Sequence, residues 1–220
     1  LMALLANILS VGAAMVLHGL IQLTSNGYRA YLNRYDIDWK ITFQFAIGTG
    51  LAMAALLVLA YTPERATVMI ALGALPYIAA TVPKSLALDI TRPAMPIFAG
   101  FVVVLTNLIA GVGGPLLDVF FQRVALTRHQ VVATKAIGQS LGHLAKIVFF
   151  GGIVATASAD DWPNAWLLAA CLVMTIIGTI LGKRILDKMH DATFFAWTQR
   201  IMLTLGALLI ARGLYLILAG

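Results

Sequence analysis

The sequence predicts an all-α polytopic membrane protein, and three observations support that prediction. The chain has 220 residues, of which 61% are hydrophobic and 11% charged, whereas about a quarter of a soluble domain is charged. Its apolar runs approach the length of about 20 residues that crosses the hydrocarbon core of a bilayer. They recur along the whole chain, which excludes a single secretory signal peptide. The runs without Asp, Glu, Lys or Arg are 1–28, 41–61, 66–82, 93–117 and 162–182.

Proline-containing breaks divide these runs into helices. The dipeptides Thr62-Pro63, Val82-Pro83, Arg92-Pro93 and Trp162-Pro163 are typical of connections. A short amphipathic segment at the membrane surface is expected over 84–92. The predicted helices are 3–33, 40–61, 65–81, 94–111, 115–122, 126–151, 162–185 and 192–218.

Two of these helices carry polar residues in the same register, which predicts an internal repeat. Gln22 matches Gln139 at an offset of 117 residues (139 − 22 = 117). The tetrapeptide LGAL also occurs twice, at 72–75 and at 205–208. At the offset of 117 the further matches are His18 with Lys135, Asn26 with His143, and Arg29 with Lys146. We therefore expect a first repeat over 1–83, an interfacial linker over 84–93 and a second repeat over 94–220.

The basic residues predict that the two repeats are inverted relative to each other. One cluster of bases follows the first helix and another follows the helix over 162–185, and basic loops favour the cytoplasm. The two polar helices then cross the membrane in opposite directions, as inverted repeats do in many secondary transporters. The counterpart of 94–122 would precede Leu1, so we expect the first repeat to lack its N-terminal hairpin in this chain. The clusters are Arg29, Arg34 and Lys40, and Lys183, Arg184 and Lys188.

The matched polar residues form one stripe on each helix. At 100° per residue, Lys135, Gln139, His143 and Lys146 lie within about 80° of one another. An ionisable group that faces lipid costs several kcal/mol, so each stripe must face protein or a water-filled cavity. Lys135, roughly nine residues into its helix, lies well below the membrane surface and is the leading candidate, whereas Lys146 lies near a helix end, where snorkelling is an alternative. The substrate-binding candidates on these helices are His18, Gln22, Asn26, Lys135, Gln139 and His143, with Arg29 and Lys146 as coupling or charge partners.

The motif GVGGP at 111–115 predicts a broken helix. Its glycines permit backbone conformations that other residues avoid, and Pro115 suits the first turn of a new helix. Because 115–122 is too short to span a membrane, a re-entrant hairpin is favoured over a plain kink between two spans. The N-terminus of such a half-helix favours an anion, which adds Gly113, Gly114 and Pro115 to the candidates. Asp118, one turn further on, is a possible coupling or charge partner.

The gathered side chains are mostly cationic or hydrogen-bond donors, which indicates a small oxyanion as substrate and not a metal cation. The single Cys171 has no metal-ligand spacing around it, and no cofactor is expected. No compact basic patch interleaved with aromatic residues occurs, which excludes nucleic acid as a partner. The residues alone therefore predict an anion transporter in contact with membrane lipid. A coupling proton or sodium ion and a homodimer stay open.

The same tracts resemble the TauE/SafE family of sulfite exporters and related permeases. The resemblance rests on GVGGPLLDVFF, TRHQVVATKAIGQSLGHLAKIVFFGG and HGLIQLTSNGYRAYLNRYDIDW, and it covers nearly the whole chain. It implies a multi-pass carrier of the bacterial inner membrane with two related halves. The substrates that it implies are sulfite, sulfonates or other organosulfur anions.

Two other functions compete with a carrier. The sequence cannot separate a carrier from an anion channel. The tract GQSLG at 138–142 also fits the G-x-S-x-G pattern of serine hydrolases, with Ser140 as nucleophile. That pattern requires a turn between a strand and a helix, whereas here it falls inside a predicted helix. Hydrolysis is therefore the least favoured of these functions.

Overall fold

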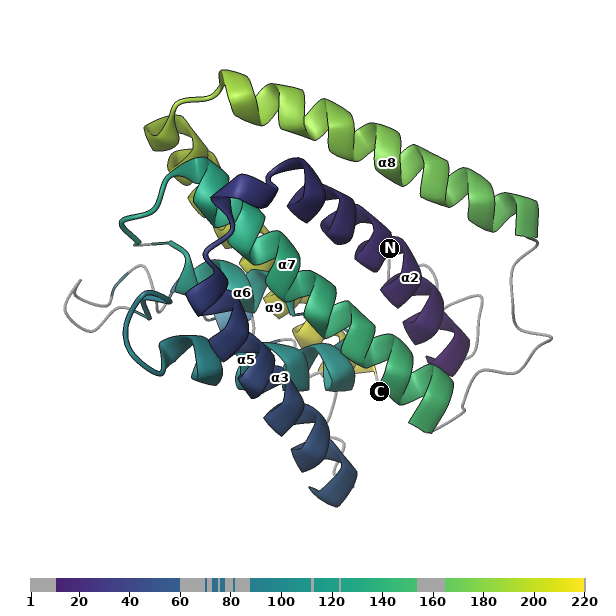
Figure 1. Ribbon diagram of the computed structural model, residues 1–220. Coiled ribbons are helices and arrows are strands. Elements are labelled where there is room, and N and C mark those ends of the chain that lie inside the picture. The colour runs from purple at the N-terminus through teal and green to yellow at the C-terminus, as the bar shows by residue number, and fades with distance from the viewer. Residues whose placement is uncertain are drawn as a thin grey trace. The chain divides into compact units, whose positions relative to one another are not determined.

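The computed structural model of the protein describes residues 11–59, 70, 73–74, 76–77, 81, 88–111, 113–122, 124–153 and 165–219. Within these residues the regular secondary structure is helical, without strands, which confirms the all-α prediction (Figure 1). Three of the described helices are long and apolar enough to cross a membrane, over Trp39–Val58, Leu168–Lys188 and Asp191–Leu218. Most of the helix predicted over 65–81 lies outside the described residues.

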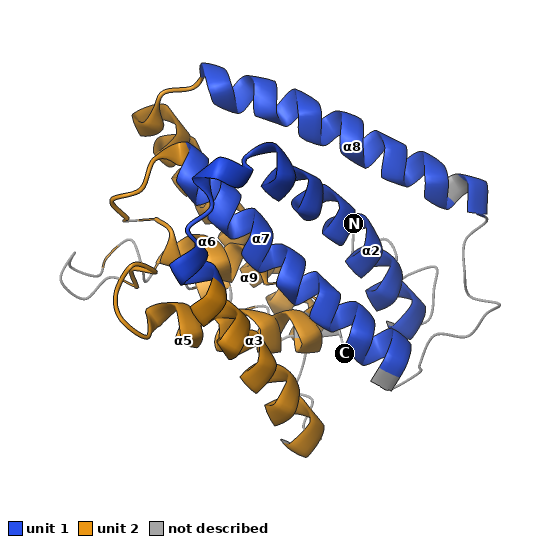
Figure 2. Ribbon diagram, in the orientation of Figure 1, with its two compact units in different colours: residues 1–42, 129–188 blue, residues 43–128, 189–220 orange. Residues whose placement is uncertain are grey.

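The chain forms two compact units, which Figure 2 shows in blue and orange. Unit 1 comprises residues 1–42 and 129–188, and unit 2 comprises residues 43–128 and 189–220. Each unit therefore takes segments from both of the predicted repeats. Unit 1 contains α2 (Val11–Leu32), nearly all of α7 (Arg128–Ile147) and α8 (Ala165–Lys188). Unit 2 contains most of α3 (Trp39–Leu59), together with α5 (Met95–Ala110), α6 (Gly114–Phe120) and α9 (Asp191–Ala219).

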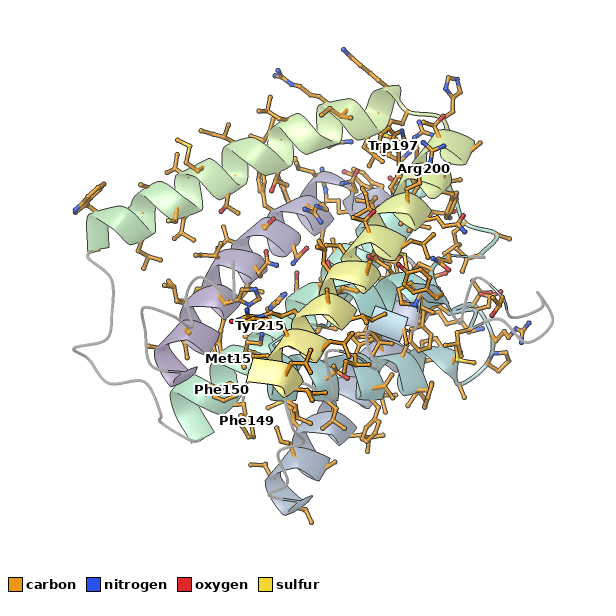
Figure 3. All side chains as sticks on the ribbon, turned by 180° about the vertical axis from the view of Figure 1, so that it is seen from behind. Met15, Phe149, Phe150, Trp197, Arg200 and Tyr215 are labelled. Carbon is orange, nitrogen blue, oxygen red and sulfur yellow. The ribbon has the colours of Figure 1, made fainter. Side chains whose placement is uncertain are left out.

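In unit 1, α2 lies between α7 and α8, and it runs in the opposite direction to α7 (Figure 1). A Cβ added to Gly19 would lie 2.8 Å from the Ile147 side chain, and one added to Gly27 would lie 4.0 Å from Ser140 Oγ. Helix α7 continues as a π-helical segment, Val148–Ile153, which packs against α2. Figure 3 shows Phe149 and Phe150 of this segment near Met15 of α2.

A polar network joins three helix ends in unit 1. Asp187 accepts hydrogen bonds from Lys183 Nζ at 3.0 Å and, in the ion pair with His129, lies 3.0 Å from Nε2. Lys183 Nζ also donates to Asn33 Oδ1 at 3.3 Å, just beyond the last residue of α2. The C-terminal ends of α2 and α8 and the N-terminal end of α7 therefore lie at one end of unit 1.

In unit 2, glycines allow helix backbones to touch. A Cβ on Gly48 of α3 would overlap the carbonyl oxygen of Ile97 in α5, and a Cβ on Gly100 would overlap that of Phe45. Gly73 and Gly206 face each other in the same way, with each added Cβ 2.5 and 2.7 Å from the other's carbonyl oxygen. Small residues are the common means by which membrane helices approach closely without polar contacts.

The GVGGP motif ends one helix and begins another. Helix α5 stops at Ala110, and Gly111 takes a left-handed conformation with φ 74° while its N–H donates to Asn107 O at 3.1 Å. Helix α6 begins at Gly114 with Pro115 in its first turn, and it has seven residues.

Helix α6 returns alongside α5. The rings of Phe120 and Phe98 meet edge to face at 6.2 Å, and the N–H of Ile90 donates to Phe120 O at 3.1 Å. The hairpin from 95 to 120 therefore enters and leaves at the same end of α5. Of the predicted surface linker, 84–87 lie outside the described residues, and Asp89 and Thr91 form a turn through a 2.9 Å hydrogen bond from the Thr91 N–H to Asp89 Oδ1.

Candidate functional site between α2 and α7

The polar stripes of α2 and α7 meet inside unit 1. Three of their side chains, His18, His143 and Lys146, form what we call the buried cluster. Lys146 Nζ lies 3.4 Å from His18 Nδ1, and the two imidazole rings meet edge to face with centroids 5.5 Å apart. Lys146 is fully buried, at 0% exposure, and each histidine is 7% exposed. The predicted polar helices therefore direct their ionisable groups at each other within this unit.

The hydrogen-bond chemistry of the buried cluster leaves one atom unsatisfied. Lys146 Nζ and His18 Nδ1 lie within hydrogen-bond distance, and the ammonium form of Lys146 would donate to His18 Nδ1, with the His18 proton on Nε2. His143 Nδ1 is buried, and the described residues give it no hydrogen-bond partner. An unmet buried polar atom costs about 1–3 kcal/mol, so it marks a position where a ligand atom would be stabilising.

The chemistry of the buried cluster suits an anion better than a cation. The buried side chains within the described residues include no Asp or Glu, and these residues contain no group of His, Cys, Asp and Glu that could hold a metal ion. An ammonium and an imidazole N–H both donate to oxyanions, and such charge-assisted hydrogen bonds are about twice as strong as neutral ones.

A second group of polar residues lies further along the same two helices. Asn26 is buried, and its Oδ1 accepts a hydrogen bond from Arg29 NH1 at 3.4 Å. Lys135, Gln22 and Gln139 are half-buried. The site therefore continues along α2 and α7 beyond the buried cluster.

The structure makes Lys146, and not Lys135, the more buried of the two candidate lysines. Lys135, the leading candidate from sequence, is half-buried, whereas Lys146, for which snorkelling was an alternative, is the fully buried lysine. Helix α7 continues beyond Lys146 as the π-helical segment, where a Cβ added to Gly151 would lie 3.4 Å from the Val16 side chain of α2.

The remaining predicted site residues belong to unit 2. Gly113, Gly114 and Pro115 form the start of α6, and Asp118 lies half-buried within it. A Cβ on Gly113 would lie 2.8 Å from Val103 O, so this glycine is needed for the close return of the hairpin.

Ser140, the nucleophile of the hydrolase alternative, lies in the middle of α7. Its hydroxyl donates to the carbonyl oxygen of Ala136 at 2.8 Å, and the side chain is buried. Ser140 lies within a continuous helix, whereas a nucleophilic serine is exposed at an elbow between a strand and a helix. This geometry favours a packing role for Ser140.

Sequence reasoning missed the polar network at the end of unit 1. His129 and Asp187 are separated by 58 residues, so no local pattern joins them. The spacing of Lys183 and Asp187 at i and i+4 was the available signal, because such pairs face each other on a helix.

Comparisons with known proteins add no identification, since no family model, no curated protein and no solved structure matches the chain.

Proposed function

We propose that the protein is a multi-pass secondary transporter of small sulfur-containing oxyanions, such as sulfite and sulfonates, in the bacterial inner membrane. Its substrate site lies between α2 and α7, near the middle of the bilayer. The buried cluster carries this proposal, because it combines a fully buried lysine with an imidazole nitrogen, His143 Nδ1, that has no partner among the described residues.

The anion would bind by replacing the missing hydrogen-bond partner. One oxygen accepts from His143 Nδ1–H and another from Lys146, while His18 holds the lysine by accepting from its ammonium. Binding then neutralises a buried positive charge, which otherwise costs several kcal/mol to keep out of water. The choice of sulfur oxyanions rests on the resemblance to the sulfite exporter family.

Three features of the fold support an inverted-repeat transporter. Helices α2 and α7, which carry the matching stripes, run in opposite directions. Gly73 and Gly206, which occupy equivalent positions in the two LGAL tracts, contact each other reciprocally, as equivalent residues do beside a two-fold axis. The 3.3 Å contact of Lys183 with Asn33 brings the two predicted cytoplasmic clusters to one end of unit 1.

The hairpin of α5 and α6 supports the same architecture. It enters and leaves at one end, as a re-entrant segment does, and broken helices are typical of substrate pathways in transporters. The exposed apolar side chains of α8, Val173, Met174 and Ile177 among them, suit contact with lipid.

The test is anion flux in proteoliposomes that contain the purified protein. Uptake of labelled sulfite and of a labelled sulfonate is measured for the wild type, for Lys146→Met and for Lys188→Met. Lys188 is an exposed base at the end of α8, so its variant removes the same charge outside the site. We expect saturable uptake in the wild type and in Lys188→Met, and its loss in Lys146→Met.

Two results would contradict the proposal. Equal uptake in Lys146→Met and in the wild type would remove the buried cluster from the pathway. Uptake that rises linearly with anion concentration, without saturation, would favour a channel over a carrier.

A further inference from the structure

The matching stripes of α2 and α7 place two cationic clusters on one helix pair. The buried cluster consists of His18, His143 and Lys146. At the offset of 117 residues, Lys146 corresponds to Arg29 and His143 corresponds to Asn26 (146 − 117 = 29; 143 − 117 = 26). It also relates His18 to Lys135 (18 + 117 = 135). We call Asn26, Arg29 and Lys135 the second cluster.

The spacing of residues inside the second cluster repeats the spacing in the first. Lys146 and His143 share a face of α7 three residues apart, and both side chains are buried. Arg29 and Asn26 are likewise three residues apart on α2, where Arg29 NH1 donates to Asn26 Oδ1 at 3.4 Å. In both clusters a cation therefore lies one helical turn beyond a buried side chain that can hydrogen-bond to an oxyanion.

The antiparallel register of α2 and α7 brings Lys135 close to the level of Arg29. Gly19 lies against His143 and Ile147, and Gly27 lies against Ser140. Extended by two residues along α2, this register places Arg29 within about one turn of Lys135 on α7. The clusters stand at opposite ends of the helix crossing, with Gln22 and Gln139 between them. The eleven residues from His18 to Arg29 (29 − 18 = 11) correspond to about 16 Å along the axis.

We propose that this helix pair holds two binding sites for small oxyanions, one at each cluster. The inference rests on the proposed transport function and adds a second site to it. The amide of Asn26 and the guanidinium of Arg29 supply donors at the second site, as His143 and Lys146 do at the first. An anion passes from one site to the other along Gln22 and Gln139, whose amide groups donate hydrogen bonds between them.

Two sites at this spacing also provide a means of release. Two anions bound together repel each other through a medium of low dielectric constant, so the second binds more weakly than the first. Conduction and transport both require binding that is strong enough to admit the ion and weak enough to release it.

Anion binding by the full chain in lipid nanodiscs tests the inference. Sulfite and methanesulfonate are titrated calorimetrically into the wild type, Lys146→Met, Arg29→Met and the double variant, with Lys188→Met as the control. We expect two sites per chain in the wild type and in Lys188→Met, one in each single variant, and none in the double variant. Lys135→Met is made alongside, because it removes a cation from the second cluster while keeping the Arg29–Asn26 hydrogen bond, should Arg29→Met fail to fold.

The outcomes separate this inference from the proposed function. A single site in the wild type that Lys146→Met abolishes, or full binding in both Arg29→Met and Lys135→Met, would overturn the second site and leave the transport proposal standing. No binding of either anion by the folded wild type would contradict both proposals.

Discussion

The two units differ in the groups that pack in their interiors. Unit 1 contains all the buried ionisable side chains among the described residues, namely His18, His143 and Lys146. Unit 2 brings helix backbones together at glycines, with Gly48 against α5 and Gly73 against Gly206. Close backbone packing gives a rigid scaffold without polar atoms to satisfy, whereas a buried charge needs a partner. In the function that we propose, unit 1 holds the buried cluster, and unit 2 contributes close helix packing and the α5–α6 hairpin.

The largest effect on function is expected from Lys146→Met. Loss of a hydrogen bond to a charged group, worth about 1.5–3 kcal/mol, should lower anion flux by about tenfold or more. The free energy of unfolding should change by less than about 1 kcal/mol, because Met fills a similar volume and relief of the buried charge offsets the lost contact with His18. Flux in proteoliposomes and thermal unfolding in detergent measure the two quantities. A large loss of stability together with flux would make Lys146 a structural residue.

The largest effect on stability is expected in unit 2, from Gly48→Ala. The new Cβ would overlap the Ile97 carbonyl oxygen, so α3 and α5 must separate, at a cost of about 1–3 kcal/mol or more. Gly50→Ala on the same helix is the matched control, because a Cβ there meets nothing within 4 Å. Alanine in a helix interior should stabilise that variant by about 0.5–1 kcal/mol. Thermal unfolding of both proteins compares them, and equal midpoints would refute the close packing of α3 on α5.

A smaller effect is expected from the corresponding change in unit 1, Gly19→Ala. Its nearest neighbour would be the Ile147 side chain at 2.8 Å, which can rotate away, whereas a backbone carbonyl cannot. The cost should stay below about 1 kcal/mol, less than for Gly48→Ala. The same thermal measurement checks this order. Reversal of the order would show that α2 and α7 pack as rigidly as the helices of unit 2.

The smallest effect is expected from Asp187→Asn at the end of unit 1. This change removes the ion pairs with Lys183 and His129, but the Asp187 side chain is 46% exposed, and such pairs contribute about 0–1 kcal/mol. The difference from the wild type should disappear at about 1 M salt, where the screening length falls to about 3 Å. A loss that persists at high salt would assign these residues a structural role beyond the ion pairs.

The sequence predicted the helices well, because apolar runs without charges leave few other structures open. It also predicted the polar stripes of α2 and α7, from which His18, His143 and Lys146 come together. It did not predict which members would meet, since that depends on how far α2 and α7 are shifted along each other. The contact of His18 with Lys146 spans 128 residues and follows from the antiparallel crossing at Gly19. The predicted helix over 126–151 already extended beyond Lys146, but no sequence signal indicated that residues 148–153 would be π-helical.

Binding of the anion at the buried cluster is tested most directly through the four histidines of the chain. The protein is labelled with 15N-histidine, its imidazole signals are assigned with single His→Gln variants, and sulfite is titrated in. We expect the signals of His18 and His143 to shift and saturate together, while those of His129, which is paired with Asp187, and of the exposed His190 stay in place. Saturating shifts confined to His129 or His190, or no shift at His143, would contradict it.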